Sequence, residues 1–281
     1  MASGVASAPR VAKEAALSLR GDLFVDTPQA IKAIKINRWL PYWAVFQADV
    51  RSTLRSWVYR TWVLVSLLCA VAYLIYKVGV YREAGIVQHA SGMMSDLLRW
   101  CVFGSVTLII VLTAGCISSE RGTMADSVLS RGISRYQYFF GKWHARLTTV
   151  LGTYLVLGLS ALIASFFLFH EDLTLTGGLV ALVTVAAVLA AVISSGVTVS
   201  AIFNNTLVCV TVLWIAFYGA GFVLSLIPGH YLTPYRVLNS LPEILHGEYN
   251  LDVIGRLVGW SALVSCAVAA IGLGYFSRRD V

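Results

Sequence analysis

The stretch TWVLVSLLCAVAYLIYKVGV, residues 61–80, contains a single charged side chain, Lys77. A helix needs roughly 20 mostly apolar residues to cross the hydrocarbon core of a bilayer, because every backbone polar group must be paired within the span. The rest of the chain has the same character: 58% of its 281 residues are hydrophobic, 12% are charged, and the mean hydropathy is +0.77. The sequence therefore predicts an integral membrane protein made of helices.

Six apolar runs of this kind follow one another along the chain. They cover residues 61–80, 100–118, 147–169, 179–203, 207–228 and 253–276. The predicted fold class is thus all-α, a polytopic membrane protein with six transmembrane helices. Glycines within the runs, among them Gly158, Gly196 and the pair Gly255 and Gly259, indicate close approach between helices.

Lys and Arg residues gather on one side of the six predicted spans. Most of the 21 precede residue 61, lie between the second and third runs, or follow residue 276. Because basic residues are retained on the cytoplasmic side, both termini and the loop 119–146 are predicted to be cytoplasmic in a multi-pass protein of the inner or plasma membrane. This topology accounts for the net charge of +7, so no nucleic-acid partner is expected.

The segment before the first span has two parts. Residues 1–41 lack an apolar core of signal-peptide length and are expected to form a cytoplasmic extension. Residues 42–58 predict a helix with an apolar face and a polar face, the latter including Asp49. Such a helix is expected either to lie flat in the inner membrane interface against lipids or to be a plain juxtamembrane anchor. Its assigned interfacial residues are Trp43, Phe46, Arg51, Arg55 and Trp57.

The loop between the second and third runs, residues 119–146, is polar and basic. Thr123 and Asp126 have the spacing of a capping box, which predicts a short helix beginning near Met124. Val128 shares a face with Met124, and Gly132 is the expected stop for this helix. The pattern indicates either a docking element or simply a well-formed loop.

A second capping box follows within the same loop. Ser134 and Gln137 have the spacing in which a hydroxyl and a side-chain amide each satisfy a free backbone amide at a helix start. A helix is therefore predicted to begin there and to run through Gly141 and Lys142 into the third span.

The loop resembles that of the type 2 ATP-binding-cassette exporter permeases. Their pattern is close to Glu-x-Gly-Thr, an apolar helix, Pro-Ile-Ser-Arg and Gly-Lys. This chain reads Glu120-Arg121-Gly122-Thr123, then Val128-Leu129, Gly132-Ile133-Ser134-Arg135 and Gly141-Lys142, with Gly132 where the family more often has proline. The resemblance covers residues 42–281.

The resemblance implies a six-span permease domain over residues 42–281. It implies an elbow helix at 42–58, a coupling loop at 119–146 that docks on a separate ATPase subunit, and an outer loop at 229–252 with short helices. A second permease subunit, identical or related, would complete the substrate pathway. The residues it assigns to coupling are Glu120, Gly122, Thr123, Met124, Asp126, Val128, Arg131, Ser134, Arg135, Gly141 and Lys142.

No catalytic or metal site is expected in this chain. It has no Gly-x-x-x-x-Gly-Lys-[Ser/Thr] loop, since Trp143 follows Gly141-Lys142, so ATP and Mg would be bound by the partner ATPase. No acid and base pair and no nucleophile with a neighbouring base is found. Histidines and methionines in or near the predicted outer loops would suit copper or zinc in a metal-linked export role, but no pair has ligand spacing, which favours scattered interface residues. They are His89, His170, His230, His246, Met93 and Met94.

Two other functions are open to a chain of this kind. A membrane anchor could transmit ATPase motion to an outer-face accessory protein docked on residues 229–252, without conducting substrate. A secondary carrier would need acidic residues within its spans, and the six runs contain none. Apolar runs would suit a lipid-like or amphiphilic cargo, but the sequence does not identify the substrate.

Overall fold

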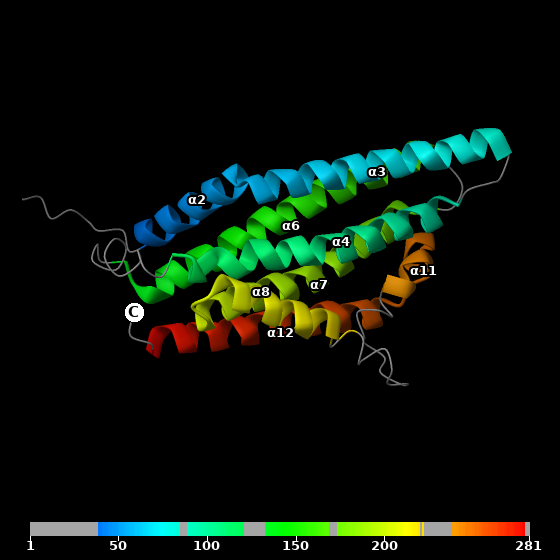
Figure 1. Cartoon of the computed structure of the whole chain (residues 1–281). Coiled ribbons are helices and arrows are strands. Elements are labelled where there is room, and N and C mark those ends of the chain that lie inside the picture. Colours follow the sequence, from blue (N-terminus) through cyan, green and yellow to red (C-terminus); the bar gives the residue numbers. More distant parts are fainter. Residues whose placement is uncertain are drawn as a thin grey trace, which may run out of the picture. The chain divides into compact units, whose positions relative to one another are not determined.

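The computed structural model describes residues 39–84, 89–120, 133–168, 173–219, 221 and 238–278. Every regular element in these ranges is a helix, and none of them contains a strand, which confirms the all-α class. The elements are α2 (Leu40–Arg55), α3 (Trp57–Ala84), α4 (Ala90–Ser118), α6 (Arg135–Leu168), α7 (Leu175–Ile202), α8 (Thr206–Trp214), the π-helix η2 (Ile215–Gly219), α11 (Leu241–His246) and α12 (Leu251–Arg278) (Figure 1).

Five helices are long and apolar enough to cross a membrane, namely α3, α4, α6, α7 and α12. The membrane-helix character predicted from the sequence is therefore confirmed. The predicted span 207–228 begins with a shorter apolar helix, Thr206–Gly219, formed by α8 and η2. Its remainder lies largely outside the described residues, so the sixth span stays a prediction.

The start of α6 has the reciprocal capping predicted from its sequence. The Ser134 amide donates to Gln137 Oε1 at 3.1 Å, and the Gln137 amide donates to Ser134 Oγ at 3.3 Å. Two free amides of the first turn are satisfied in this way, which explains why the helix begins at Arg135.

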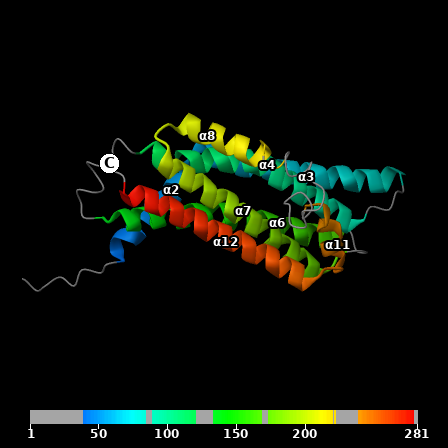
Figure 2. The ribbon, with the colours of Figure 1, turned by 90° about the horizontal axis from the view of Figure 1, so that it is seen from below.

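Helix α7 lies between its neighbours α4, α6 and α12 (Figure 2). Glycines allow the close approach: a side chain at Gly196 would collide with Thr113 of α4, and one at Gly272 of α12 would meet Thr198 Oγ1 at 2.8 Å. Small residues let helix backbones approach one another in this manner. The approach predicted at Gly255 and Gly259 is not found, since no side chain or distant backbone lies within 4 Å of an added Cβ there.

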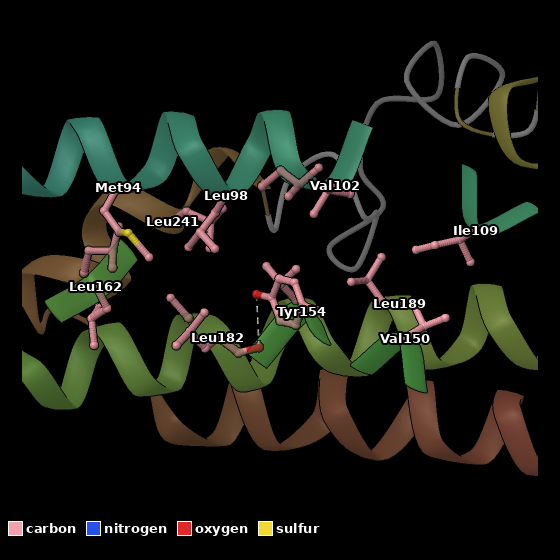
Figure 3. Packing of buried hydrophobic residues seen from close by; sticks show 14 of the residues in the cluster. Met94, Leu98, Val102, Ile109, Val150, Tyr154, Leu162, Leu182, Leu189 and Leu241 are labelled. Atoms are coloured by element: carbon pink, nitrogen blue, oxygen red, sulfur yellow. Dashed lines mark hydrogen bonds between the residues drawn. The ribbon is translucent and has the colours of Figure 1, made fainter. Parts of the chain in front are cut away.

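The core lies among α4, α6 and α7. Figure 3 shows Leu98 and Val102 of α4 pointing toward Tyr154 of α6 and Leu182 of α7, and the Tyr154 hydroxyl donates to the Leu182 carbonyl at 3.4 Å. Met94 is fully buried in the same cluster, so it is a packing residue and not a ligand at the outer face.

Helix α3 packs mainly through aromatic side chains that hydrogen-bond to neighbouring helices. Trp62 Nε1 donates to Ser105 Oγ at 3.1 Å, and the Tyr73 hydroxyl donates to Asp96 Oδ2 at 3.0 Å. Because α4 begins at Ala90, Asp96 lies within a candidate span, contrary to the expectation that the spans contain no acidic residue. The tyrosine hydroxyl provides the hydrogen bond that a carboxylate needs there.

A short helix precedes the last span, within the outer loop assigned to residues 229–252. Helix α11 packs against α4 and α7, at the end of the bundle opposite to α2 (Figure 1). The Thr174 amide donates to the Leu245 carbonyl at 3.1 Å, and Arg99 Nε donates to the Leu238 carbonyl at 2.8 Å. His246 Nε2 lies 2.9 Å from Ser91 Oγ. These bonds fix α11 on the ends of the two longer helices.

Candidate functional site

Helix α2 packs along the first turns of α6 (Figure 1). Its contact face carries Val45, Asp49 and Thr53 at helical spacing, and Asp49 and Thr53 are only 4% and 1% exposed. Gly141 of α6 permits this approach, since a Cβ there would lie 2.9 Å from Val45 Cγ1 and 3.3 Å from the Tyr42 carbonyl oxygen. The glycine assigned to the coupling loop thus lies at the contact between α2 and α6.

The prediction that Asp49 belongs to an outward polar face of this helix is wrong. Trp43 and Leu54 of the predicted apolar face and Arg51 and Arg55 of the predicted polar face are all exposed. A third face, between these two, meets α6 and buries Asp49. Of the other assigned residues, Phe46 is partly buried and Trp57 is the first residue of α3. An interfacial role for α2 stays a prediction.

Asp49 is neutralised by two cations from α6. Lys142 Nζ and Arg146 Nη2 each donate to Asp49 Oδ1 at 3.3 Å. Arg146 Nε lies 3.1 Å from Asp49 Oδ2, as a charge contact without hydrogen-bond geometry. Lys142 and Arg146 are four residues apart, so they lie one above the other on the helix face that contacts α2.

Lys142 also contacts the end of α4. Its Nζ lies 2.7 Å from Glu120 Oε1 and donates to the Cys116 carbonyl at 2.9 Å. The second oxygen of Glu120 accepts a 2.8 Å hydrogen bond from the Tyr138 hydroxyl, and the Lys142 ammonium lies 5.3 Å from the centre of the Tyr138 ring. Glu120 and Lys142, which flank the predicted coupling helix in the sequence, are therefore in contact.

We call Asp49, Glu120, Lys142 and Arg146 the charge cluster; it joins α2, the residue two places after α4, and α6. Two carboxylates and two cations give it no net charge. Removing water from such groups is costly, and the cost is offset only while each charge keeps its partner. The cluster should therefore hold the three segments in one arrangement.

Glu120 is the most exposed member of the charge cluster, with 47% of its side chain accessible. Partial burial acts to raise the pKa of the Glu120 carboxyl, but attraction to the Lys142 ammonium and hydrogen bonds from Lys142 and Tyr138 act to lower it. The net result is a pKa below the ordinary value, so Glu120 is ionised at neutral pH.

The assigned residue Arg135, together with Tyr138, ties α6 to α12 at the same end. Arg135 Nη1 donates to the Ser277 carbonyl at 3.0 Å, and the Tyr138 ring stacks on Phe276 with centroids 6.1 Å apart. Ser134 forms the capping box already described. The remaining coupling assignments fall outside the described residues, as do His170 and His230. Those assignments are Gly122, Thr123, Met124, Asp126, Val128 and Arg131.

Sequence reasoning missed Asp49, Arg146 and Tyr138. One signal was present: Lys142 and Arg146 place two cations on one face at the start of a long apolar run, where a buried carboxylate is needed as partner. Asp49 is the only acidic residue in α2 and was the obvious candidate.

The charge cluster is suited to a structural role, in which paired charges hold three segments together. Within the ranges that the structure covers, no group of three or more His, Cys, Asp or Glu side chains is placed to hold a metal ion. The charged groups are paired with one another, which suits mechanical connection between helices better than bond-breaking chemistry.

A scan of family models and a search of curated proteins found no match to this chain. A function must therefore be argued from its own residues.

Proposed function

We propose that this chain is the transmembrane permease subunit of an ATP-binding-cassette exporter. It couples to a separate ATPase subunit, and it forms the substrate pathway together with a second permease subunit. The end of the bundle that carries α2 and the charge cluster faces the cytoplasm, and the end that carries α11 faces outward. The five apolar helices and the distribution of basic residues support this placement.

The observation that carries the proposal is the contact between Glu120 and Lys142. Helix α4 ends at Ser118, two residues before Glu120, and α6 begins at Arg135, about two turns before Lys142. The 2.7 Å contact between Glu120 and Lys142 joins the two ends of the predicted coupling segment. Asp49 connects α2 to the same charge cluster. A force applied to that segment by an ATPase would reach three helices at once.

The charge cluster also accounts for the defined structure at the two described ends of the loop, residues 119–120 and 133–146. A solvated loop needs neither a buried Lys142 nor a reciprocal cap at Ser134 and Gln137. Rigid ends convert a displacement of the intervening segment into a rotation of the helices, whereas flexible ends would absorb it. Rigid anchoring of both ends is therefore what a coupling element requires.

Co-purification with the ATPase tests this proposal. Met124→Asp combined with Val128→Asp should release the ATPase, because burial of the two apolar side chains would contribute about 1.5 to 3 kcal/mol each to docking. Leu251→Asp, a change of similar chemistry at the exposed first residue of α12, should retain it. ATPase retention by the double variant equal to that of the control would contradict the docking role.

Flux through reconstituted protein separates a permease from a membrane anchor. Liposomes that contain only this chain and its ATPase should move a fluorescent phospholipid analogue in an ATP-dependent manner. An anchor that serves an outer-face accessory protein would hydrolyse ATP in the same liposomes without such movement.

A further inference from the structure

The last turn of α4 is bonded to side chains of two other helices. The amides of Ile117 and Ser118 donate to Ser200 Oγ of α7 at 2.9 and 3.0 Å. The carbonyl of the preceding residue, Cys116, accepts from Lys142 Nζ of α6. Ser200 is fully buried. Three consecutive residues of α4 are thus held from outside the helix.

The bond from Lys142 lies where a helix is least able to hold itself. The last four carbonyls of a helix have no amide partner within it, and Cys116 supplies one of them. A side-chain oxygen that accepts two backbone amides also competes with the helix's own ladder and bends it. The Ser119 amide reaches the Gly115 carbonyl only at 3.4 Å, a long bond that fits a loosened last turn.

Close packing brings Ser200 within reach of α4. One turn earlier in α7, Gly196 lies so near Thr113 of α4 that a side chain there would collide with it. Helix α7 packs against α4, α6, α8, α11 and α12, so it is a fixed support for the end of α4. Ser200 connects α7 to Ser118, which lies two residues before Glu120.

We propose that Ser200 is a positioning residue: with Lys142, it holds the last turn of α4 and sets the direction in which the chain leaves toward residues 121–132. Without its oxygen, the last turn frays and Glu120 no longer stays against Lys142. That this direction serves coupling to an ATPase rests on the proposed function. The contact by which Ser200 holds the last turn of α4 does not depend on the proposed function.

Amide hydrogen exchange in lipid nanodiscs tests whether Ser200 holds the last turn of α4. Ser200→Ala should speed exchange at Ile117 and Ser118 about fivefold, the effect of losing one ordinary hydrogen bond. The matched control is Ser195→Ala, because Ser195 Oγ bonds only to the Ala191 carbonyl in its own helix. Ser200→Thr, which keeps the hydroxyl, should restore slow exchange. Equal exchange at these amides in Ser200→Ala and Ser195→Ala would overturn the proposal.

A transport measurement tests whether Ser200 acts in coupling and not only in packing between α4 and α7. In liposomes with its ATPase, Ser200→Ala should keep ATP hydrolysis but move several-fold less phospholipid analogue per ATP, while Ser195→Ala keeps the wild-type ratio. A wild-type ratio in Ser200→Ala would overturn the positioning role. If the wild-type chain moves no cargo with ATP, the proposed function fails, and the exchange comparison still decides whether Ser200 holds α4.

Discussion

Lys142 Nζ lies 2.7 Å from Glu120 Oε1 and 3.3 Å from Asp49 Oδ1, so one ammonium connects the end of α4 to α2. The lysine comes from α6 and is itself buried. Its position makes it the common partner of both carboxylates in the charge cluster.

Replacing Asp49 should strongly destabilise the fold. Asp49→Leu leaves Lys142 and Arg146 buried with Glu120 as their only carboxylate in the charge cluster, and loss of one partner from a buried pair costs about 3–5 kcal/mol. Thermal unfolding in detergent measures the loss. Arg51→Gln, on the exposed face of the same helix, should change stability by less than about 0.5 kcal/mol. The prediction is contradicted if the two variants unfold at the same temperature.

Adding a methyl group at Gly141 should separate α2 from α6. In Gly141→Ala the new Cβ would lie 2.9 Å from Val45 Cγ1, and such overpacking costs about 1–3 kcal/mol. Gly152→Ala is the control on the same helix, because an added Cβ there has nothing within 4 Å. The control should unfold at or above the wild-type temperature. A Gly141→Ala protein that is as stable as the control would show that α2 does not pack closely at this point.

Acidification should weaken the bond between α4 and α6. The pKa of Glu120 is lowered in the folded protein, so its ionised form adds stability that is fully present above the ordinary value of 4.5 and is lost as pH falls through the lower folded pKa. Glu120→Gln lacks this contribution at every pH. The stability difference between wild type and Glu120→Gln should therefore shrink below pH 4.5 and stay constant from about pH 6 to about pH 8, where the carboxyl is ionised in both the folded and the unfolded chain. A difference that grows on acidification would contradict the assignment.

Cysteine labelling tests which end faces the cytoplasm. Cysteines introduced at Thr174 and Gly247, both exposed near α11, should react with an impermeant thiol reagent in intact cells. A cysteine at Ser130 should react only after the cells are opened. Labelling of Ser130 in intact cells would reverse the proposed orientation, and the coupling role would fail with it.

The sequence predicted local features well because they depend on neighbouring residues. The capping box of Ser134 and Gln137 and the long apolar helices are of this kind. The helical pattern of residues 42–58 alone could not predict the burial of Asp49, because the pattern of one segment does not reveal which face meets another helix; the signal lay in Lys142 and Arg146 of α6. The resemblance placed Glu120 and Lys142 in one motif, but their contact depends on how α4 and α6 pack.

Asp96 illustrates the same limit. The hydropathy of residues 90–99 gave no reason to extend the second span over a carboxylate. In the structure α4 covers Asp96, and the carboxylate accepts a hydrogen bond from Tyr73 of α3. Asp49 and Asp96 both have partners on other helices, and the pattern of a single segment does not show such partners.

In the proposed permease, the charge cluster transmits movement from an ATPase to the helices. The most direct test is the amount of phospholipid analogue moved per ATP in liposomes that contain Glu120→Gln and the bound ATPase. Glu248→Gln, an exposed glutamate near α11, serves as the control. We predict that Glu120→Gln keeps its ATPase and its ATP hydrolysis but moves several-fold less cargo per ATP, while the control behaves as wild type. An unchanged ratio in Glu120→Gln would contradict the account.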